Sequence, residues 1–473
     1  MSTVFVGPGL LALVLAAIVP SISIPRRADR LAVVGAFGVL LWSAFIATSY
    51  YAGSSSTLVL DALLSRWFGL DGFTAPLLPF EALLGLAALV ATGRNEPVKT
   101  SAILAGEGVF LLLFTSLDLD LVVILWILSF VPGVFSTRPG TSGRRAVWFV
   151  GLVSTIPLLI ARIAVQLEGR SPFVPELLAA PLDTYGKLFF WSTMAAVASR
   201  TALFPFHTWL FVALERGALP LTALMLCARP GAYLLARIAT PIAPETAAEA
   251  LLPIATGALL TAIYGGILGL SAENPRRVLG TIAMSHSGLI VIGLCSGSPE
   301  GITGALVQWT TVGVSVMGLA LIVARLEARL GDLSRVRGLI TPLPGLSVAF
   351  LLFGVASVGF PGTLGFIGED LLIHGMLESH PKMAAGMILV TALNGLTLMR
   401  IFMRIFFGPV KLPAPNPIRM LRRERFAVLA LLAVVLGFGI VPAPFVRVRS
   451  PDTFALPVLR SGVLDATHPQ RAP

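Results

Sequence analysis

The sequence predicts an all-α, polytopic integral membrane protein with about fourteen transmembrane helices. The first observation is composition, because 56% of the 473 residues are hydrophobic and only 12% are charged, against about 25% charged in soluble domains. The second is that long apolar runs recur from end to end, with a mean hydropathy of +0.89. The third is that basic residues alternate between the predicted loops.

Each apolar run defines one predicted span. The spans are residues 3–23, 31–50, 73–93, 98–116, 119–135, 146–166, 186–205, 219–240, 250–271, 277–296, 301–325, 342–377, 383–408 and 426–446. The first run is too long for the hydrophobic region of a signal peptide and is followed by basic residues, so we expect a retained span. The run at 342–377 is too long for one straight crossing and must be tilted or broken.

Basic residues follow the odd-numbered spans. They are Arg26, Arg27 and Arg30; Arg94 and Lys99; Arg138, Arg144 and Arg145; Arg276 and Arg277; Arg325, Arg329, Arg335 and Arg337; and Lys411, Arg419, Arg422, Arg423 and Arg425. The positive-inside rule places these loops in the cytoplasm and both termini on the non-cytoplasmic side of a cell inner (plasma) membrane. The net charge of +10 therefore reflects topology, and no nucleic-acid partner is expected.

Two spans are interrupted by proline in a similar setting. Pro205 breaks the seventh span, and Pro361 with Gly362 breaks the twelfth. If spans 4–8 and 9–13 are five-helix repeats, these are the fourth helix of each, and the odd helix number makes the repeats inverted. Matching interrupted helices in inverted repeats indicate an ion pathway; the alternative is that the kinks are merely tolerated. The predicted domains are 1–97, 98–240, 241–410 and 411–473.

Ionisable residues inside the spans indicate a functional or structural role, because burying a charge in a bilayer costs free energy. The candidates for a proton pathway are Glu107, Arg200, His207, Arg229, His286, Glu369 and Asp370. Arginine keeps its proton, so only the acids and histidines can titrate. The structural alternative is that Arg200 pairs with Glu107 to lock helices together and that backbone N–H groups freed at the break cap Glu369.

Two other features carry weaker expectations. Cys227 and Cys295 lie in apolar runs without a cysteine or histidine cluster, so no disulfide, zinc or iron–sulfur site is expected, and no cofactor or metal. The basic stretch from Lys411 to Arg425 is interpreted as a cytoplasmic anchor at the headgroups or a partner contact. Residues 447–473 are expected to be a poorly ordered exterior tail.

Three motifs resemble one family of membrane proteins. They are Phe204-Pro-Phe-His-Thr-Trp-Leu210, Ala283-Met-Ser-His-Ser-Gly-Leu289 and Gly359-Phe-Pro-Gly-Thr-Leu-Gly-Phe-Ile-Gly-Glu369. They resemble the antiporter-like subunits of proton-pumping NADH:quinone oxidoreductase (complex I), of Mrp sodium/proton antiporters and of membrane-bound hydrogenases, and most of all the chain M type of complex I. Gly69-Leu-Asp-Gly72 and Ser116-Leu-Asp-Leu119 add to the match, which spans about 69–409.

The resemblance implies fourteen helices, inverted repeats, and a proton pathway along a central hydrophilic axis that leaves near Glu369. The chain departs from the family pattern at several positions. Ile127 replaces the acid of span 5, while Arg200 and Arg229 stand where lysines are expected. Asn274-Pro275-Arg276 replaces an Asp-x-Lys, and Val312 replaces a histidine.

Three functions remain open. The first is a proton-translocating subunit of a redox-driven NADH:quinone oxidoreductase-type complex, with other membrane subunits, the lipid bilayer and protons (or Na⁺) as partners. The second is a paralogous structural subunit with a degenerate, non-conducting channel. The third is an ion or inorganic-carbon transport module of another assembly. No redox or catalytic centre is expected in this chain.

Overall fold

The computed structural model describes residues 6–22, 24–52, 67–92, 97–136, 141–227, 229–409 and 421–449. Arg94, Arg138, Lys411 and Arg419 of the predicted basic loops lie outside these residues. In the first half the helices are α1 Gly7–Ile18, α2 Pro25–Tyr51, α3 Leu77–Ala91, α4 Pro97–Thr115, α5 Leu119–Leu128, α6 Val131–Ser136, α7 Ser142–Leu167, α8 Val174–Ala179, α9 Gly186–Arg200, α10 Thr208–Arg216, α11 Leu219–Cys227, α12 Pro230–Leu234 and α13 Thr240–Ile242.

The second half is also helical. Its helices are α14 Pro244–Ser271, α15 Pro275–Leu294, α16 Pro299–Leu330, α17 Pro344–Ser357, α18 Leu364–Leu377, α19 Pro381–Phe406, α20 Arg422–Ile440 and α21 Ala443–Arg449. A π-helical turn, Leu235–Ala239, joins α12 to α13. The all-α membrane fold is thereby confirmed.

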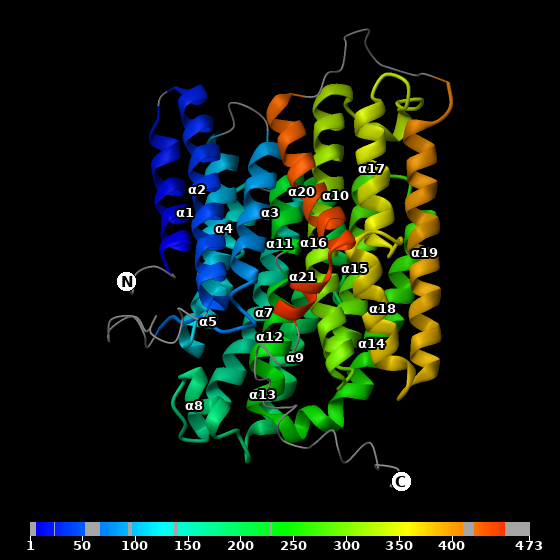
Figure 1. Cartoon of the computed structure of the whole chain (residues 1–473). Helices are drawn as coiled ribbons and strands as arrows, with labels where there is room; N and C mark the ends of the chain where they lie inside the picture. Colours follow the sequence, from blue (N-terminus) through cyan, green and yellow to red (C-terminus); the bar gives the residue numbers. More distant parts are fainter. Residues whose placement is uncertain are drawn as a thin grey trace.

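Every predicted span coincides with a helix or with an interrupted helix. Within the described ranges, seven helices are long and apolar enough to cross a membrane by themselves. The count of fourteen crossings remains a prediction, because several spans are built from shorter helices in series. The predicted breaks are present, between α9 and α10 and between α17 and α18. Figure 1 shows α9 below α10 but α17 above α18, so the two broken helices run in opposite directions.

The sequence did not predict two further interruptions. The fifth span divides between α5 and α6, and the eighth divides at Arg229, between α11 and α12. Arg229 has a positive φ of 49°, a conformation that L-residues rarely adopt and that stops helical hydrogen bonding. The eighth span therefore joins the seventh and the twelfth as a span whose helix is broken beside a buried ionisable residue.

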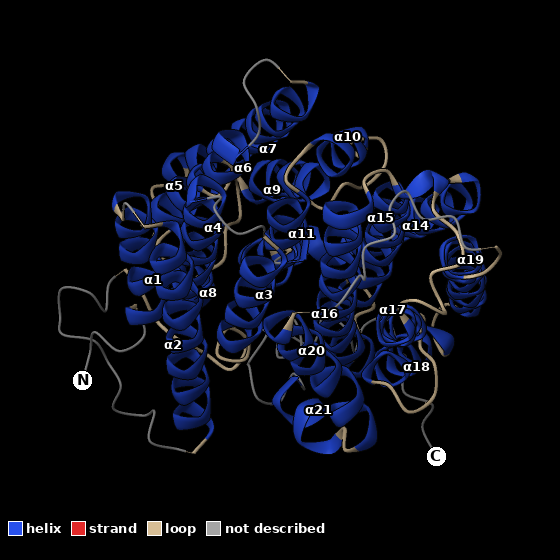
Figure 2. Ribbon diagram, turned by 90° about the horizontal axis from the view of Figure 1, so that it is seen from above, coloured by secondary structure: helices blue, strands red, loops and turns tan. Residues whose placement is uncertain are grey.

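Helix α16 forms the centre of the molecule. It packs against α3, α11, α15, α17, α18 and α20, as the view from above shows (Figure 2). Helices α7, α14 and α19 lie at the periphery and expose large apolar side chains such as Phe149, Leu260 and Leu396. Exposed apolar faces on the outside and polar groups inside are the arrangement that a bilayer selects.

Short acidic motifs start two of the helical segments. Asp71 accepts hydrogen bonds from the backbone N–H groups of Phe73 (3.1 Å) and Thr74 (2.8 Å). Its other oxygen pairs with Arg237 of the π-helical turn at 2.6 Å. Asp118 caps α5 by accepting from the N–H of Asp120 at 2.8 Å. Asp118 thus satisfies an N–H group that the start of α5 leaves unpaired, whereas Asp71 stabilises the turn that precedes α3.

Hydrogen bonds to Glu168 stabilise the segment between α7 and α9. Its carboxylate accepts from the backbone N–H groups of Asp183 (2.9 Å), Thr184 (3.1 Å) and Tyr185 (2.8 Å). Burial raises the pKa of this carboxyl, but the three hydrogen bonds outweigh it and the pKa is lowered. The ionised form therefore fixes the entry to α9.

The expectation for the C-terminal segment is partly wrong. Helix α20 ends at Ile440, and α21 turns away from it by 93°. Arg449, expected in a disordered tail, is only 1% exposed and donates to Thr310 Oγ1 on α16 at 2.8 Å. Residues 450–473 lie outside the described part of the chain.

Candidate functional site

The break between α17 and α18 positions Glu369. Gly359 and Gly362 both have positive φ, 66° and 86°, which turns the chain between the two half-helices. A Cβ on Gly359 would lie 2.5 Å from Glu369 Oε2, so only glycine leaves room for this carboxyl. Pro361 and Gly362 are themselves exposed. The break therefore supplies both the bend and the space for a buried acid.

Side chains from three helices surround the Glu369 carboxyl. Gln308 Nε2 on α16 donates to Oε1 at 3.2 Å, and Thr391 Oγ1 on α19 donates to Oε2 at 3.0 Å. His286 Nε2 on α15 lies 3.9 Å from Oε1. The prediction that backbone N–H groups cap Glu369 is wrong, because side chains of remote helices do so. These donors stabilise the ionised carboxylate, and the neighbouring histidine is a side chain of a type that can carry a proton.

His286 faces a carbonyl oxygen at each ring nitrogen. Nδ1 lies 2.9 Å from the Ile282 oxygen, and Nε2 lies 2.7 Å from the Ser357 oxygen. Ser357 is the last residue of α17, so its carbonyl is one that the break leaves without a helical partner. A protonated ring can donate to both carbonyls, whereas a neutral ring can donate to only one. The site accordingly has a place for a proton on His286 beside Glu369.

Arg229 extends this group toward the first half of the chain. Its Nη1 donates to Ser287 Oγ at 2.6 Å, next to His286 in sequence. Its Nε and Nη2 are buried and have no hydrogen-bond partner among the described residues. Arg229, Ser287, His286 and Glu369 are called the C-terminal polar file below. The file joins α12 of the first predicted repeat to α15 and α18 of the second.

Arg200 has a different environment. Its guanidinium carbon lies 4.0 Å from the centroid of the Phe130 ring, 5.6 Å from Trp126 and 5.9 Å from Phe110. The prediction that Arg200 pairs with Glu107 is wrong, since the ion pairs of the described residues do not include it. Ile127 is 43% exposed, so that position does not face this cage of rings. The guanidinium of Arg200 therefore lies beside aromatic rings rather than a carboxylate. The rings of Phe110, Trp126 and Phe130 are called the aromatic cage below.

Besides Arg200 and Glu107, two further predicted pathway residues are not brought into the file. His207 begins α10, after exposed Pro205, and its ring packs with Tyr264 at 5.3 Å and Phe204 at 5.7 Å. Asp370 lies on the outer face of α18, where its half-exposed side chain is 3.4 Å from exposed His374. Successive side chains on a helix point about 100° apart, so Asp370 faces outward although its neighbour Glu369 faces the interior.

The structure adds an acid that the sequence reasoning missed. Glu81 on α3 is fully buried, as is Glu107 on α4, and neither carboxyl has a hydrogen-bond partner within the described ranges. A single glutamate within an apolar run, in Leu78-Pro79-Phe80-Glu81, was the available signal. Gln308 and Thr391 carried no such signal, because polar uncharged residues are common in membrane helices.

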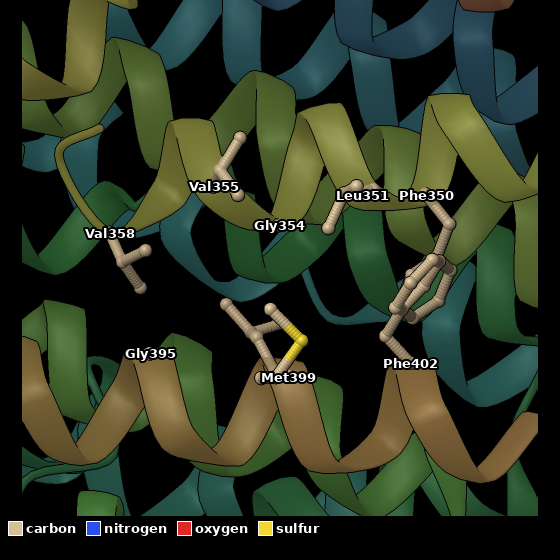
Figure 3. A pocket seen from close by; sticks show the side chains of 9 residues that line it. Phe350, Leu351, Gly354, Val355, Val358, Gly395, Met399 and Phe402 are labelled. Carbon is tan, nitrogen blue, oxygen red and sulfur yellow. The ribbon is translucent and has the colours of Figure 1, made fainter. Parts of the chain in front are cut away.

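An apolar pocket lies away from these groups. It occupies about 280 Å³ between α17 and α19 (Figure 3). It is lined by Phe350, Leu351, Gly354, Val355, Val358, Gly395, Leu398, Met399 and Phe402. This lining includes no titratable side chain, so the pocket is separate from the polar file. In the described residues, no group of three or more His, Cys, Asp and Glu side chains could hold a metal ion.

Opposed broken helices around buried charges and a carboxyl–histidine pair define an antiporter-like, multi-pass membrane subunit. Residues 108–395 match the family described as NADH:quinone oxidoreductase/Mrp antiporter, transmembrane. The chain belongs to this family, and the resemblance inferred from its motifs is confirmed.

Similar proteins agree with this assignment. The chain is 32% identical over 410 residues to NADH-quinone oxidoreductase subunit 13 of Thermus thermophilus, covering 84% of this chain and 86% of the relative. It is 27% identical over 426 residues to NADH-quinone oxidoreductase subunit M of Pseudomonas aeruginosa, covering 82% and 81%. A chain of respiratory complex I from Thermus thermophilus superposes with a TM-score of 0.87 at 28% identity, covering 96% and 99%. A chain of the Mrp complex from Dietzia shares the fold at 21% identity, with a TM-score of 0.82 and coverage of 98% and 99%.

Proposed function

We propose that this chain translocates protons as the antiporter-like membrane subunit of a redox-driven complex of the NADH:quinone oxidoreductase type. The single observation that carries this proposal is the Glu369 carboxyl, buried beside a broken helix and 3.9 Å from a histidine ring nitrogen. Buried ionisable groups at interrupted helices mark ion pathways in membrane transporters. The named relatives are subunits of such oxidoreductases.

Proton movement follows from the donors and acceptors in the C-terminal polar file. Arg229 keeps its charge and holds Ser287, so it biases its neighbours without releasing a proton. A protonated His286 transfers its Nε2 proton to Glu369 once a small side-chain movement closes the 3.9 Å separation. Gln308 and Thr391 donate to the ionised carboxylate, so Glu369 can release the proton, and the starting state returns when His286 takes up another proton.

The partners are other membrane subunits that supply the driving reaction. Support comes from the neighbouring structures, which are chains of multi-subunit membrane complexes. The expected location is a bacterial inner membrane, with the basic loops in the cytoplasm. The lipid-facing helices α7, α14 and α19 are consistent with a multi-pass protein in that membrane.

Glu369→Gln tests the proposal directly. The substitution removes the titratable group and keeps its shape, so we expect the complex to pump fewer protons per NADH oxidised. The measurement is dye-monitored acidification in vesicles, normalised to the oxidation rate. Glu378→Gln, at the exposed end of the same helix, is the control and should pump normally. A normal proton-to-electron ratio in Glu369→Gln would overturn the route through this residue.

A second candidate is a paralogous structural subunit with a degenerate, non-conducting channel. The observation that favours it is the aromatic cage around Arg200, where the family pattern expects a lysine facing an acid. This candidate predicts that Glu369→Gln leaves pumping unchanged while the complex still assembles. Sodium transport is distinguished from proton transport by repeating the measurement with Na⁺ replaced by K⁺. Only sodium transport would then stop.

A further inference from the structure

Two buried acids lie in the first half of the molecule, away from the C-terminal polar file. Glu81 on α3 and Glu107 on α4 are both 0% exposed. None of their four carboxyl oxygens has a hydrogen-bond partner in the described ranges. An ionised carboxylate without donors or a cation is very costly to bury, so these groups need another way to be stable.

Gly85 brings the two helices close at this point. It lies one turn after Glu81 on α3, and a Cβ there would collide with the Glu107 carboxyl. The missing side chain lets the Glu107 carboxyl reach the backbone of α3 at a position that shares a helix face with Glu81. Two like charges this deep in an apolar interior cannot both persist. The pair must therefore hold at least one proton.

Other charged groups near α3 do not neutralise the pair. Arg200 stacks on Phe130 instead. Arg325 of α16 lies at the far end of α3, where it bonds the Ala91 carbonyl and pairs with Glu424 of α20 at 3.6 Å. The charged residues of α2, Arg26, Arg27, Asp29 and Arg30, lie in its first two turns. Among the described residues, Cys227 at the end of α11 is a further titratable neighbour of Glu81.

Cys227 connects the pair to the C-terminal polar file. Its thiol lies within electrostatic range of both Glu81 and Arg229. Arg229 in turn lies within electrostatic range of His286. Titratable or charged side chains thus continue from α4 through α3, α11 and α12 to α15 and Glu369. This line does not pass through Arg200, whose environment offers no second titratable group.

We propose that Glu81 and Glu107 form a second proton-binding site, a carboxyl pair that exchanges protons with the C-terminal polar file. With one proton bound, rotation of the two side chains lets the O–H of one glutamic acid donate to a carboxylate oxygen of the other. Transfer breaks the first O–H bond and forms the second, so the charge of the pair is unchanged. A proton that leaves the pair for His286 or Glu369 of the C-terminal polar file, or that arrives from either residue, changes that charge by one. Proton exchange between this pair and the C-terminal polar file rests on the proposed function. The presence of a neutral carboxyl in the pair does not.

Infrared spectroscopy of the assembled complex tests the site. A neutral carboxylic acid has a carbonyl stretching band that shifts in D₂O and that a carboxylate or an amide lacks. We expect Glu81→Gln and Glu107→Gln each to remove or shift part of this band. Glu176→Gln, on the exposed surface of α8, is the control and should leave the band unchanged. An unchanged band in both pair variants overturns the proposal.

A second pair of measurements separates this site from the proposed function. Glu369→Gln should lower the number of protons pumped per NADH and leave the band of the pair in place, whereas Glu81→Gln should lower pumping and also alter the band. If Glu369→Gln pumps normally while Glu81→Gln alters the band, the proposed route fails and the pair stands. Where Glu81→Gln lowers assembly, Glu81→Asp keeps an acid with a shorter reach and should shift the band. A band unaffected by Glu81→Asp as well counts against the pair.

Discussion

At the scale of single residues, the charges of this protein are held in three different ways. Glu369 is surrounded by donors from α16 and α19, and Arg229 is held by one serine. Arg200 lies among aromatic rings. The first arrangement permits proton exchange, since the carboxyl has both a donor set and a titratable neighbour. The last favours a fixed cation, because planar guanidinium stacks on ring faces and keeps its proton.

Arg200→Lys tests the role of the aromatic cage. The ammonium group is compact and strongly hydrated, so it cannot spread over three rings, and we expect a loss of about 1 kcal/mol in stability. The measurement is the thermal unfolding midpoint of the purified complex, with exposed Arg170→Lys as the control. Pumping should stay unchanged. A gain in proton flux would instead show that arginine blocks a pathway that lysine opens.

At the scale of helices, contact between α16 and α18 positions the Glu369 site. Glycines on both helices allow it: a Cβ on Gly304 would lie 2.5 Å from the Leu372 nitrogen, and one on Gly368 would lie 2.7 Å from Gln308 Oε1. Small residues of this kind let membrane helices approach closely. The hydrogen bond from Gln308 to Glu369 is therefore a consequence of backbone proximity.

Gly304→Ala should separate these helices. The new Cβ would meet the backbone nitrogen of Leu372, which cannot move aside as a flexible side chain can. We therefore expect a loss of about 1–3 kcal/mol in stability and weaker proton pumping. Gly257→Ala on α14 is the matched control, since a Cβ there meets no atom within 4 Å. Both variants are compared by thermal unfolding and by protons pumped per NADH. Equal behaviour of the two variants would contradict the proposed role of the contact.

The C-terminal helix α21 depends on one buried side chain. Arg449 donates to Thr310 on α16, and Tyr51 Oη donates to the Val448 carbonyl at 3.4 Å. Arg449→Ala should release α21 and accelerate amide hydrogen exchange in residues 443–449, because the anchoring bond is lost. Arg447→Ala changes an exposed arginine of the same helix and should exchange at the original rate. Protection that survives in Arg449→Ala would show that packing alone holds α21.

At the scale of the whole molecule, sidedness is the open topological prediction. Positive charge places the loop after α16 in the cytoplasm and the loop after α18 outside. Both native cysteines, Cys227 and Cys295, are buried, so an impermeant thiol reagent should react only with introduced sites. Thr341→Cys should be labelled from the cytoplasmic side and Ser379→Cys from the opposite side. Labelling of both from one side would contradict the predicted alternation.

The inverted-repeat division into 98–240 and 241–410 also belongs to this scale and stays a prediction. The opposed directions of α9–α10 and α17–α18 are consistent with it (Figure 1). The two halves differ in chemistry. The second contains the carboxyl–histidine pair, whereas the first contains Arg200 in its aromatic cage. A shared architecture with unequal sites means that transport capacity has to be tested in each half separately.

The sequence by itself determined the membrane class, the positions of the spans and the breaks at Pro205 and Pro361. These properties are local: hydropathy, charge alternation and proline act within a few residues along the chain. Only the tertiary structure decided which polar side chains meet. Glu107 reaches Gly85, Gln308 reaches Glu369, Arg449 reaches Thr310, and Asp370 faces outward. Such pairings depend on the rotation and close approach of helices remote in sequence, which packing determines and no local pattern records.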